Sequence, residues 1–167
     1  TYLAPMSVET AAAWDAGVDI TTDGRTWRTA WVPLEHGGLQ GLGVIQPTLW
    51  QGREGEIRML LRSTEGVIYA SRSADGGWTW DPARPTALPN NHSGLDAVGL
   101  PGGRVVLACN PVSGNWAARS PLTLLVTKIF DAPAVVRNFF AVSICSGVAM
   151  SALVTIPNAG LPNCVLY

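Results

Sequence analysis

Charged residues are scarce in this chain of 167 residues: they make up 14% of it, and the formal net charge is −1. A sequence so close to neutral has no excess of basic side chains for nucleic acid or an anionic membrane, so we expect neither as a partner. Cysteines are also few, and Cys109, Cys145 and Cys164 have no metal-ligand spacing. We therefore expect no metal, no cofactor and no disulfide framework, and the cysteines leave the cellular compartment open.

Glycine and proline, by contrast, are plentiful, and they favour an all-β fold of short strands joined by tight turns. The segment SADGGWTW, Ser73–Trp80, contains such a turn. Asp75 can accept hydrogen bonds from backbone N–H groups of the turn, while Gly76 and Gly77 supply the positive φ angles that it needs. Trp80 then packs its ring beside the turn, so we predict a stapled β-hairpin.

A weaker copy of this turn lies upstream in VDITTDGRTW, where Asp23 precedes Asp75 by 52 residues, but one residue fewer separates Asp23 from Trp27. A repeat of about 50 residues with short strands is typical of a β-propeller with four strands per blade. A third aspartate turn is due near Ile129, which is not acidic, so the repeat ends there. The strands are expected at Gly43–Trp50, Glu56–Arg62, Val67–Ser73, Thr86–Pro89, Gly94–Leu100, Arg104–Asn110 and Pro121–Thr127, which make one whole blade and parts of two others.

These motifs resemble the sialidase (neuraminidase) superfamily. SADGGWTW matches the Asp box S-x-D-x-G-x-T-W of its bacterial neuraminidase repeats (BNR repeats) at Ser73, Asp75, Gly77, Thr79 and Trp80. The segments GVIQPTLW, LLRSTEGVIYASRS and LPNNHSGLDAVGL are similar to predicted neuraminidases of bacteria and plants. The resemblance covers roughly Val18 to Thr127.

The resemblance implies a six-bladed propeller glycosidase that binds a substrate carboxylate through arginines. It also implies a Tyr nucleophile assisted by Glu, with an Asp as acid/base. Asp boxes of that family are structural and lie away from the active site. No Tyr–Glu pair in this sequence matches the nucleophile, because Tyr69 lies next to the structural turn and Tyr2 and Tyr167 are terminal.

Strand order indicates where a ligand would bind. In an antiparallel blade the Asp-box turns lie at one end, so the loops between the second and third strands, and between successive blades, form the opposite rim. Loops on a rigid scaffold commonly carry binding residues. This rim gathers Glu35, His36, Arg62, Glu65, Asn91, His92, Asp96, Asn110, Trp116 and Arg119.

We predict that Arg62 binds a ligand carboxylate, the alternative being a surface arginine paired with Glu65. Asp96 is the candidate catalytic acid/base if burial raises its pKa, the alternative being a cap of the turn before it.

The remaining rim residues are candidates for substrate binding. Asn91, Asn110 and His92 are expected to contact the sugar, as is His36, although a turn-forming role is an alternative for both histidines. Arg119 would supply a second anion contact, and Trp116 either a stacking platform or blade packing.

Residues 1–127 are thus expected to form a partial propeller, and residues 128–167 a divergent apolar tail. Phe139–Ile156 is an uncharged run of 18 residues. Three interpretations of the tail stay open: an aberrant or truncated C-terminus, additional strands or a helix covering the open edge, and a membrane segment. Open blade edges also predict self-association.

The leading functional hypothesis is a sialidase-like exo-glycosidase that cleaves a terminal, acidic sugar, in a chain that is incomplete and has doubtful activity. The alternatives are a non-catalytic glycan-binding propeller segment and a membrane-tethered or vestigial gene product.

Overall fold

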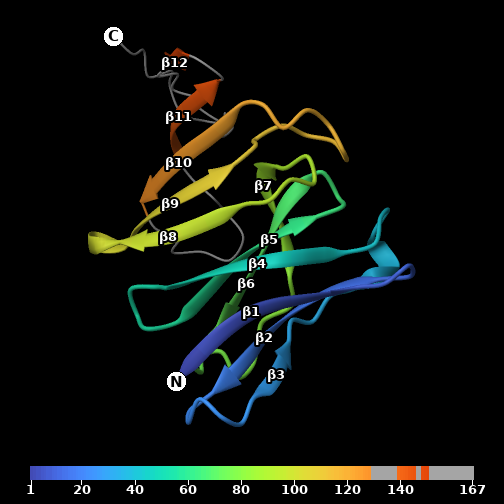
Figure 1. The fold of residues 1–167 in the computed structure, drawn as a ribbon, viewed down its shortest axis with the longest axis vertical. Coiled ribbons are helices and arrows are strands. Elements are labelled where there is room, and N and C mark those ends of the chain that lie inside the picture. Colours follow the sequence, from blue (N-terminus) through green and yellow to red (C-terminus); the bar gives the residue numbers. More distant parts are fainter. Residues whose placement is uncertain (129–138, 146–147, 151–167) are drawn as a thin grey trace.

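Three antiparallel sheets follow one another along the molecule in the computed structural model, which describes residues 1–128, 139–145 and 148–150 (Figure 1). The first sheet has the order β1-β2-β3, the middle sheet β4-β5-β6-β7, and the third β12-β11-β10-β9-β8. The strands are β1 (Tyr2–Glu9), β2 (Trp14–Thr21), β3 (Arg28–Trp31), β4 (Val44–Gln51), β5 (Ile57–Ser63), β6 (Val67–Ser73), β7 (Arg84–Pro89), β8 (Asp96–Leu100), β9 (Arg104–Cys109), β10 (Leu122–Lys128), β11 (Phe139–Cys145) and β12 (Val148–Met150). Two short 3₁₀ helices, η1 (His36–Gly38) and η2 (Pro101–Gly103), interrupt the connections.

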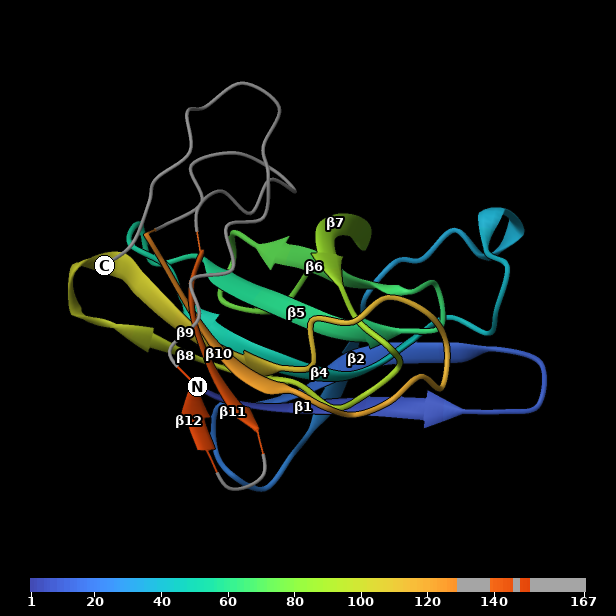
Figure 2. The same ribbon diagram turned by 90° about the horizontal axis from the view of Figure 1, so that it is seen from above.

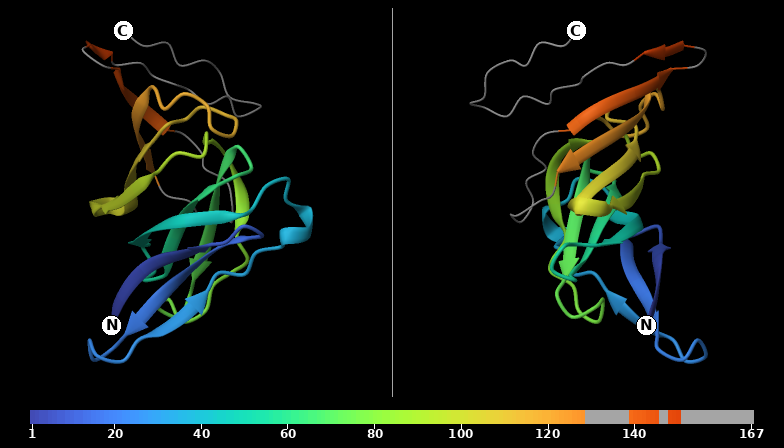
Figure 3. Two further views of the ribbon diagram at one scale, coloured as in Figure 1. Left: turned by 45° about the vertical axis from the view of Figure 1, so that its right-hand side comes forward. Right: turned by 90° about the vertical axis from the view of Figure 1, so that its left-hand side faces the viewer.

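The middle sheet is the complete four-stranded blade that the sequence predicts. Its strands β4 to β7 pair in chain order, and each lies within a few residues of the expected bounds. The described sheets do not close into a ring, as Figure 3 shows from two sides. The predicted all-β, partially built propeller is therefore confirmed.

Both faces of the middle sheet are buried, which explains the unbroken apolar run of β5. Met59 and Leu61 belong to a core cluster shared with β2, whereas Leu60 belongs to a second cluster shared with β9 and β10. Successive side chains of a strand point to opposite faces, so three consecutive apolar residues serve two interfaces. The outer sheets pack on the middle sheet through these two clusters.

The Ser73–Trp80 turn has the predicted hydrogen bonds. The Asp75 carboxylate accepts from the backbone N–H of Thr79 at 2.9 Å, from the Thr79 hydroxyl at 2.6 Å and from the Ser73 hydroxyl at 2.7 Å. Gly77, at φ 100°, faces Leu3 of the first sheet so closely that a Cβ would lie 2.9 Å from a Leu3 methyl carbon. The Trp80 ring is only 6% exposed and completes the core between the first two sheets.

The upstream turn is also held by its aspartate, with a different set of donors and without the buried ring. Asp23 accepts from the backbone N–H groups of Arg25 and Thr26, both at 2.8 Å. Trp27 nevertheless stays 48% exposed. The segment from Asp23 to Trp27 is one residue shorter than the segment from Asp75 to Trp80. The packing of a buried tryptophan beside the turn, which the repeat predicts, is absent from the first sheet.

Strands toward both ends of the chain lie outside the ranges in which the sequence predicted strands. Strand β1 precedes the region of family resemblance and pairs along its whole length with β2. Strand β11 extends the third sheet by pairing with β10, and β12 pairs with β11, so the segment expected to be a divergent tail contains strands, as one of its three interpretations allowed without giving their bounds. Among the described residues, no helix has the length and apolar character needed to cross a membrane. The other tail residues lie outside the described ranges, and the origin of the tail stays a prediction.

Candidate functional site

The loops that were expected to form a rim gather at one end of the molecule. Figure 2 shows the β1–β2 connection, the loop with η1 and the β9–β10 loop at this end, and the β8–β9 turn at the other. The Asp75 turn joins β6 to β7 and therefore lies at the end of the middle sheet away from Arg62, which is near the C-terminal end of β5. The structure thus separates the aspartate turns from the rim.

Arg62 occupies the centre of this rim, but its partners differ from the expected alternative. Its Nη1 donates to Oε1 of Gln46 at 2.8 Å, and its Nη2 lies 3.3 Å from Nε2 of His92. Glu65 instead accepts from the backbone N–H groups of Gln40 and Gly41, so the proposed Arg62–Glu65 pair is not formed. Arg62 is held by neutral partners, and among the described residues no acidic side chain pairs with its positive charge.

Partial burial and the nearby charge of Arg119 lower the pKa of the Arg62 guanidinium, opposed by Glu9. Arginine stays protonated in proteins because its ordinary pKa lies above 12. Its Nε is buried and has no hydrogen-bond partner among the described residues. An anion at this position would therefore meet a charged and incompletely paired guanidinium.

His92, the second partner of Arg62, is 1% exposed. Its ring stacks on Trp14 with a centroid distance of 5.0 Å and meets the Trp116 ring edge-on at 4.7 Å. Burial, followed by the charges of Arg62 and Arg119, lowers the His92 pKa. Arginine can only donate, so Nε2 of the neutral ring accepts and Nδ1 carries the hydrogen.

Trp116 and Arg119 project from the β9–β10 loop beside this pair. Trp116 is 68% exposed, and Cζ of Arg119 lies 5.8 Å from the centroid of its ring. A cation at this distance is attracted by the ring face. An exposed indole that is not packed into a blade favours the stacking platform over the packing alternative for Trp116.

The two predicted asparagines hold the loop that carries Trp116 and Arg119. Asn91 Nδ2 donates to the carbonyls of Ala117 and Ala118, and Asn110 Nδ2 donates to the carbonyls of Arg119 and Pro121. Both asparagine side chains are buried. Their direct contact with a ligand stays a prediction, but their contacts within the protein order the loop beside Arg62.

Backbone strain is concentrated in the same place. In the part of the chain that the structure describes, the non-glycine residues with positive φ are Gln46 at 50°, His92 at 62° and Trp116 at 60°. Arg62 contacts both Gln46 and His92, and His92 contacts Trp116. Such conformations cost free energy and cluster at functional sites, so this cluster is the best candidate for a binding site.

Asp96 lies apart from this cluster, at the first position of β8. Its side chain is exposed, and its Oδ1 accepts from the Thr48 hydroxyl at 2.7 Å. It lines a hollow of about 450 Å³ between β1, β4 and β8, to which neither Arg62 nor His92 contributes. Asn90, rather than Asp96, caps the preceding turn by accepting from the His92 backbone N–H.

The other candidates have structural partners. His36 Nε2 lies 2.8 Å from an oxygen of Asp15, and Glu35 accepts from the backbone N–H of Gly37. Tyr69 is buried in the core between the first two sheets, where burial, followed by the charge of Glu65, raises its pKa. Tyr69 is therefore no surface nucleophile, as its place beside the Asp-box turn predicted.

Sequence reasoning missed Gln46 and Trp14. Gln46 lies in a β-bulge between Ile45 and Thr48 and precedes Pro47. A proline within a strand pattern often marks a bulge, so Pro47 in GVIQPTLW could have predicted the irregularity at Gln46. Trp14 contacts His92, which lies 78 positions further along the sequence, and no local pattern predicts that contact.

A complete blade of four antiparallel strands between two further sheets, with an aspartate-held turn at one end and a polar loop rim at the other, is the architecture of a partial β-propeller. The chain belongs to the BNR repeat-like domain family, which matches residues 1–137. No curated protein matches the chain in sequence.

Solved structures show the same fold at low sequence identity. A K499G mutant of NanB sialidase from Streptococcus pneumoniae has 18% identity and a TM-score of 0.58, covering 83% of this chain and 21% of that one. The intramolecular trans-sialidase from Ruminococcus gnavus has 17% identity and a TM-score of 0.59, with coverages of 86% and 31%. A protein of unknown function from Dyadobacter fermentans has 16% identity and a TM-score of 0.55, with coverages of 76% and 34%. The chain thus spans a fifth to a third of the length of these structures and shares their fold.

Proposed function

We propose that this chain is the part of a sialidase-like glycoside hydrolase that recognises a terminal acidic sugar at the rim. The observation that carries the proposal is the strained cluster in which Arg62 is held by Gln46 and His92, beside Trp116 and Arg119. Two guanidinium groups suit a carboxylate, and an exposed indole suits the apolar face of a sugar ring. The relatives named as sialidases support this substrate class.

In the proposed mechanism, Arg62 pairs with the sugar carboxylate while His92 keeps the guanidinium in place. Arg119 adds a second positive charge, and Asn91 and Asn110 order the loop that presents it. Asp96 is proposed as the acid/base, which requires the sugar to extend from Arg62 toward β8. A Tyr nucleophile, expected from the resemblance, is proposed to lie outside this chain.

Binding and turnover of a fluorogenic sialoside test the proposal with the 167-residue chain. Arg62→Lys should weaken binding about tenfold or more, because an ammonium group cannot form the bidentate pair. Arg72→Lys is the matched control, since Arg72 is exposed and lies at the Asp-box end of β6. Equal affinities of the two variants would contradict the assignment of Arg62.

A second candidate function is a non-catalytic glycan-binding module. It is favoured by the separation of Asp96 from the Arg62 cluster and by the buried position of Tyr69. Because the hydrolase is proposed to take its nucleophile from outside this chain, the module is supported over the hydrolase only if glycan binding that depends on Arg62 occurs without hydrolysis also in a longer protein that supplies the nucleophile. Hydrolysis that Asp96→Asn abolishes would support the hydrolase.

A further inference from the structure

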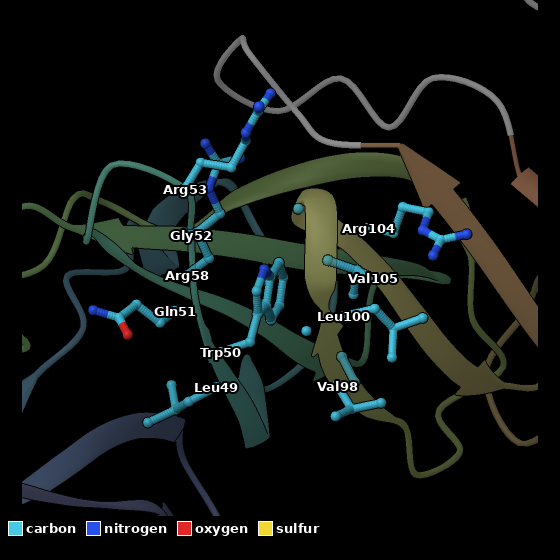
Figure 4. Close-up of a pocket in the computed structure, with 13 residues that line it drawn as sticks. Leu49, Trp50, Gln51, Gly52, Arg53, Arg58, Val98, Leu100, Arg104 and Val105 are labelled. Atoms are coloured by element: carbon cyan, nitrogen blue, oxygen red, sulfur yellow. The ribbon is translucent and has the colours of Figure 1, made fainter.

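A second pocket lies at the opposite end of the molecule from the rim, between the middle and third sheets. Its volume is about 390 Å³, which falls within the range of small-ligand sites. It is formed by the β4–β5 turn, the start of β5, and the β8–β9 segment with η2. Figure 4 labels the lining residues that matter most here: Trp50, Arg53, Arg58, Val98, Leu100 and Arg104. None of the residues of the Arg62 cluster contributes to it.

The charge of this pocket has one sign. Arg53, Arg58 and Arg104 line it, and no acidic side chain does. Arg58 is fixed by Glu56, whose Oε1 accepts from Nε at 2.7 Å. Within the described residues, the side chains of Arg53 and Arg104 have no hydrogen-bond or salt-bridge partner. Arg53 and Arg58 come from the β4–β5 hairpin and Arg104 from the start of β9. The two guanidinium groups without a partner, those of Arg53 and Arg104, give the pocket a positive charge that attracts anions.

The indole ring of Trp50 stands inside the pocket. In Figure 4 it lies between the β4–β5 turn, which carries Gly52 and Arg53, and the segment that carries Leu100 and Arg104. Gly99 lies against the same side chain, since a Cβ there would come 3.6 Å from Cδ1 of Trp50. The exposed Val98 adds to the apolar surface. The pocket thus combines a flat apolar surface with guanidinium groups at its margin.

We propose that this pocket is a second site, which binds an anionic saccharide unit: a pyranose ring that bears a carboxylate or a sulfate ester. The apolar C–H face of the ring would lie along Trp50, and the anion would pair with Arg53 or Arg104. The site is independent of the function proposed for the rim, because the two share no residue. It would attach the protein to an acidic glycan while leaving the rim open.

The indole N–H resonance of Trp50 reports directly on this site in the 167-residue chain, and its loss in Trp50→Phe identifies it. Three disaccharides are titrated: one with a glucuronate carboxylate and no sulfate, one with a sulfate ester and no carboxylate, and neutral lactose. We expect at least one anionic sugar to shift the resonance and lactose to leave it unchanged. Comparing the two anionic sugars tells which anion the pocket accepts. An equal shift with lactose, or no shift with either anionic sugar, would overturn the proposal.

Matched variants separate this pocket from the rim. Arg53→Gln and Arg104→Gln, combined, should weaken the binding seen at Trp50 about tenfold or more, because charge-assisted hydrogen bonds are lost. Arg62→Gln in the rim and Arg25→Gln in an exposed turn should leave it unchanged. If Arg62→Gln abolishes the Trp50 shift and the pocket variants do not, the second site is refuted. That result would still leave the proposed function of the rim standing.

Discussion

At the scale of the residue, the pKa of Asp75 is determined by hydrogen bonds from residues of its own turn. Hydrogen bonds from the Thr79 hydroxyl and backbone N–H, and from the Ser73 hydroxyl, lower its pKa from 3.8 to about 2. All of these donors lie within four positions of the aspartate. The carboxylate is therefore held in its charged form by the turn that it organises.

The pH dependence of stability follows from this shift. The folded-state pKa is depressed, so the contribution of Asp75 is present above pH 4 and is lost as pH falls from about 4 to about 2. We expect Asp75→Asn to be less stable than the native chain at pH 7, with a difference that shrinks through this acid range. Urea unfolding at several pH values measures it.

Asp81→Asn is the control for this experiment. Asp81 is exposed and contacts Arg72 at 3.4 Å in a pair that is also exposed. Surface pairs of this kind contribute little to stability. A stability difference for Asp75→Asn that is constant from pH 7 to about pH 2 would contradict the role of its charge.

At the scale of the element, the two aspartate turns show that the hydrogen bonds of the aspartate can form without burial of the tryptophan that follows it. Both carboxylates accept backbone hydrogen bonds. Only the turn with the full spacing brings its ring, Trp80, into the core. The hydrogen bonds shape the turn, and the length of the turn decides where the indole points.

This difference predicts unequal effects of removing the two rings. Trp80→Ala should lower the free energy of unfolding by about 3–5 kcal/mol, since it opens a cavity between the first two sheets. Trp27→Ala, the matched variant, should cost less than about 1 kcal/mol because the residue is 48% exposed and lies outside both core clusters. Chemical denaturation of both variants tests this, and equal losses would contradict the assigned packing.

At the scale of the molecule, the described strands form a row of three sheets, and the outermost strands of each sheet have one edge that pairs with no other described strand. Strand β1 is an edge of the first sheet, and it pairs only with β2 among the described strands. Val8 near its end is exposed. A free edge of this kind offers backbone hydrogen-bonding groups to another chain, which is the physical basis for the predicted self-association.

A charge on the edge strand tests that prediction. We expect the chain to associate as its concentration rises, and we expect Val8→Lys to reduce the association because lysine blocks edge pairing. Leu122→Lys is the control, since Leu122 is also exposed but lies in β10, between β9 and β11. Sedimentation velocity measures both, and a monomer at every concentration would contradict the prediction.

Much of the architecture was predictable because its signals are local. The Asp75 hydrogen bonds join residues at most four positions apart, and the strands of the middle sheet follow from alternation and turn residues. The placement of the rim opposite the aspartate turns followed from antiparallel pairing alone. These features depend on short-range sterics and hydrogen bonding, which the order of residues determines directly.

The composition of the candidate site, in contrast, was decided by the tertiary structure. Arg62 meets Gln46 and His92 rather than Glu65, and His92 lies against Trp14 from the first sheet. These contacts join segments 16 to 78 positions apart, so they depend on how three sheets stack and on a bulge at Gln46. By itself the sequence determined the middle blade and the end of the molecule at which the rim loops gather. Packing between the sheets decided which side chains contact Arg62 and His92. Residues so distant in sequence meet only when the sheets pack closely against one another, and the local sequence does not specify that packing.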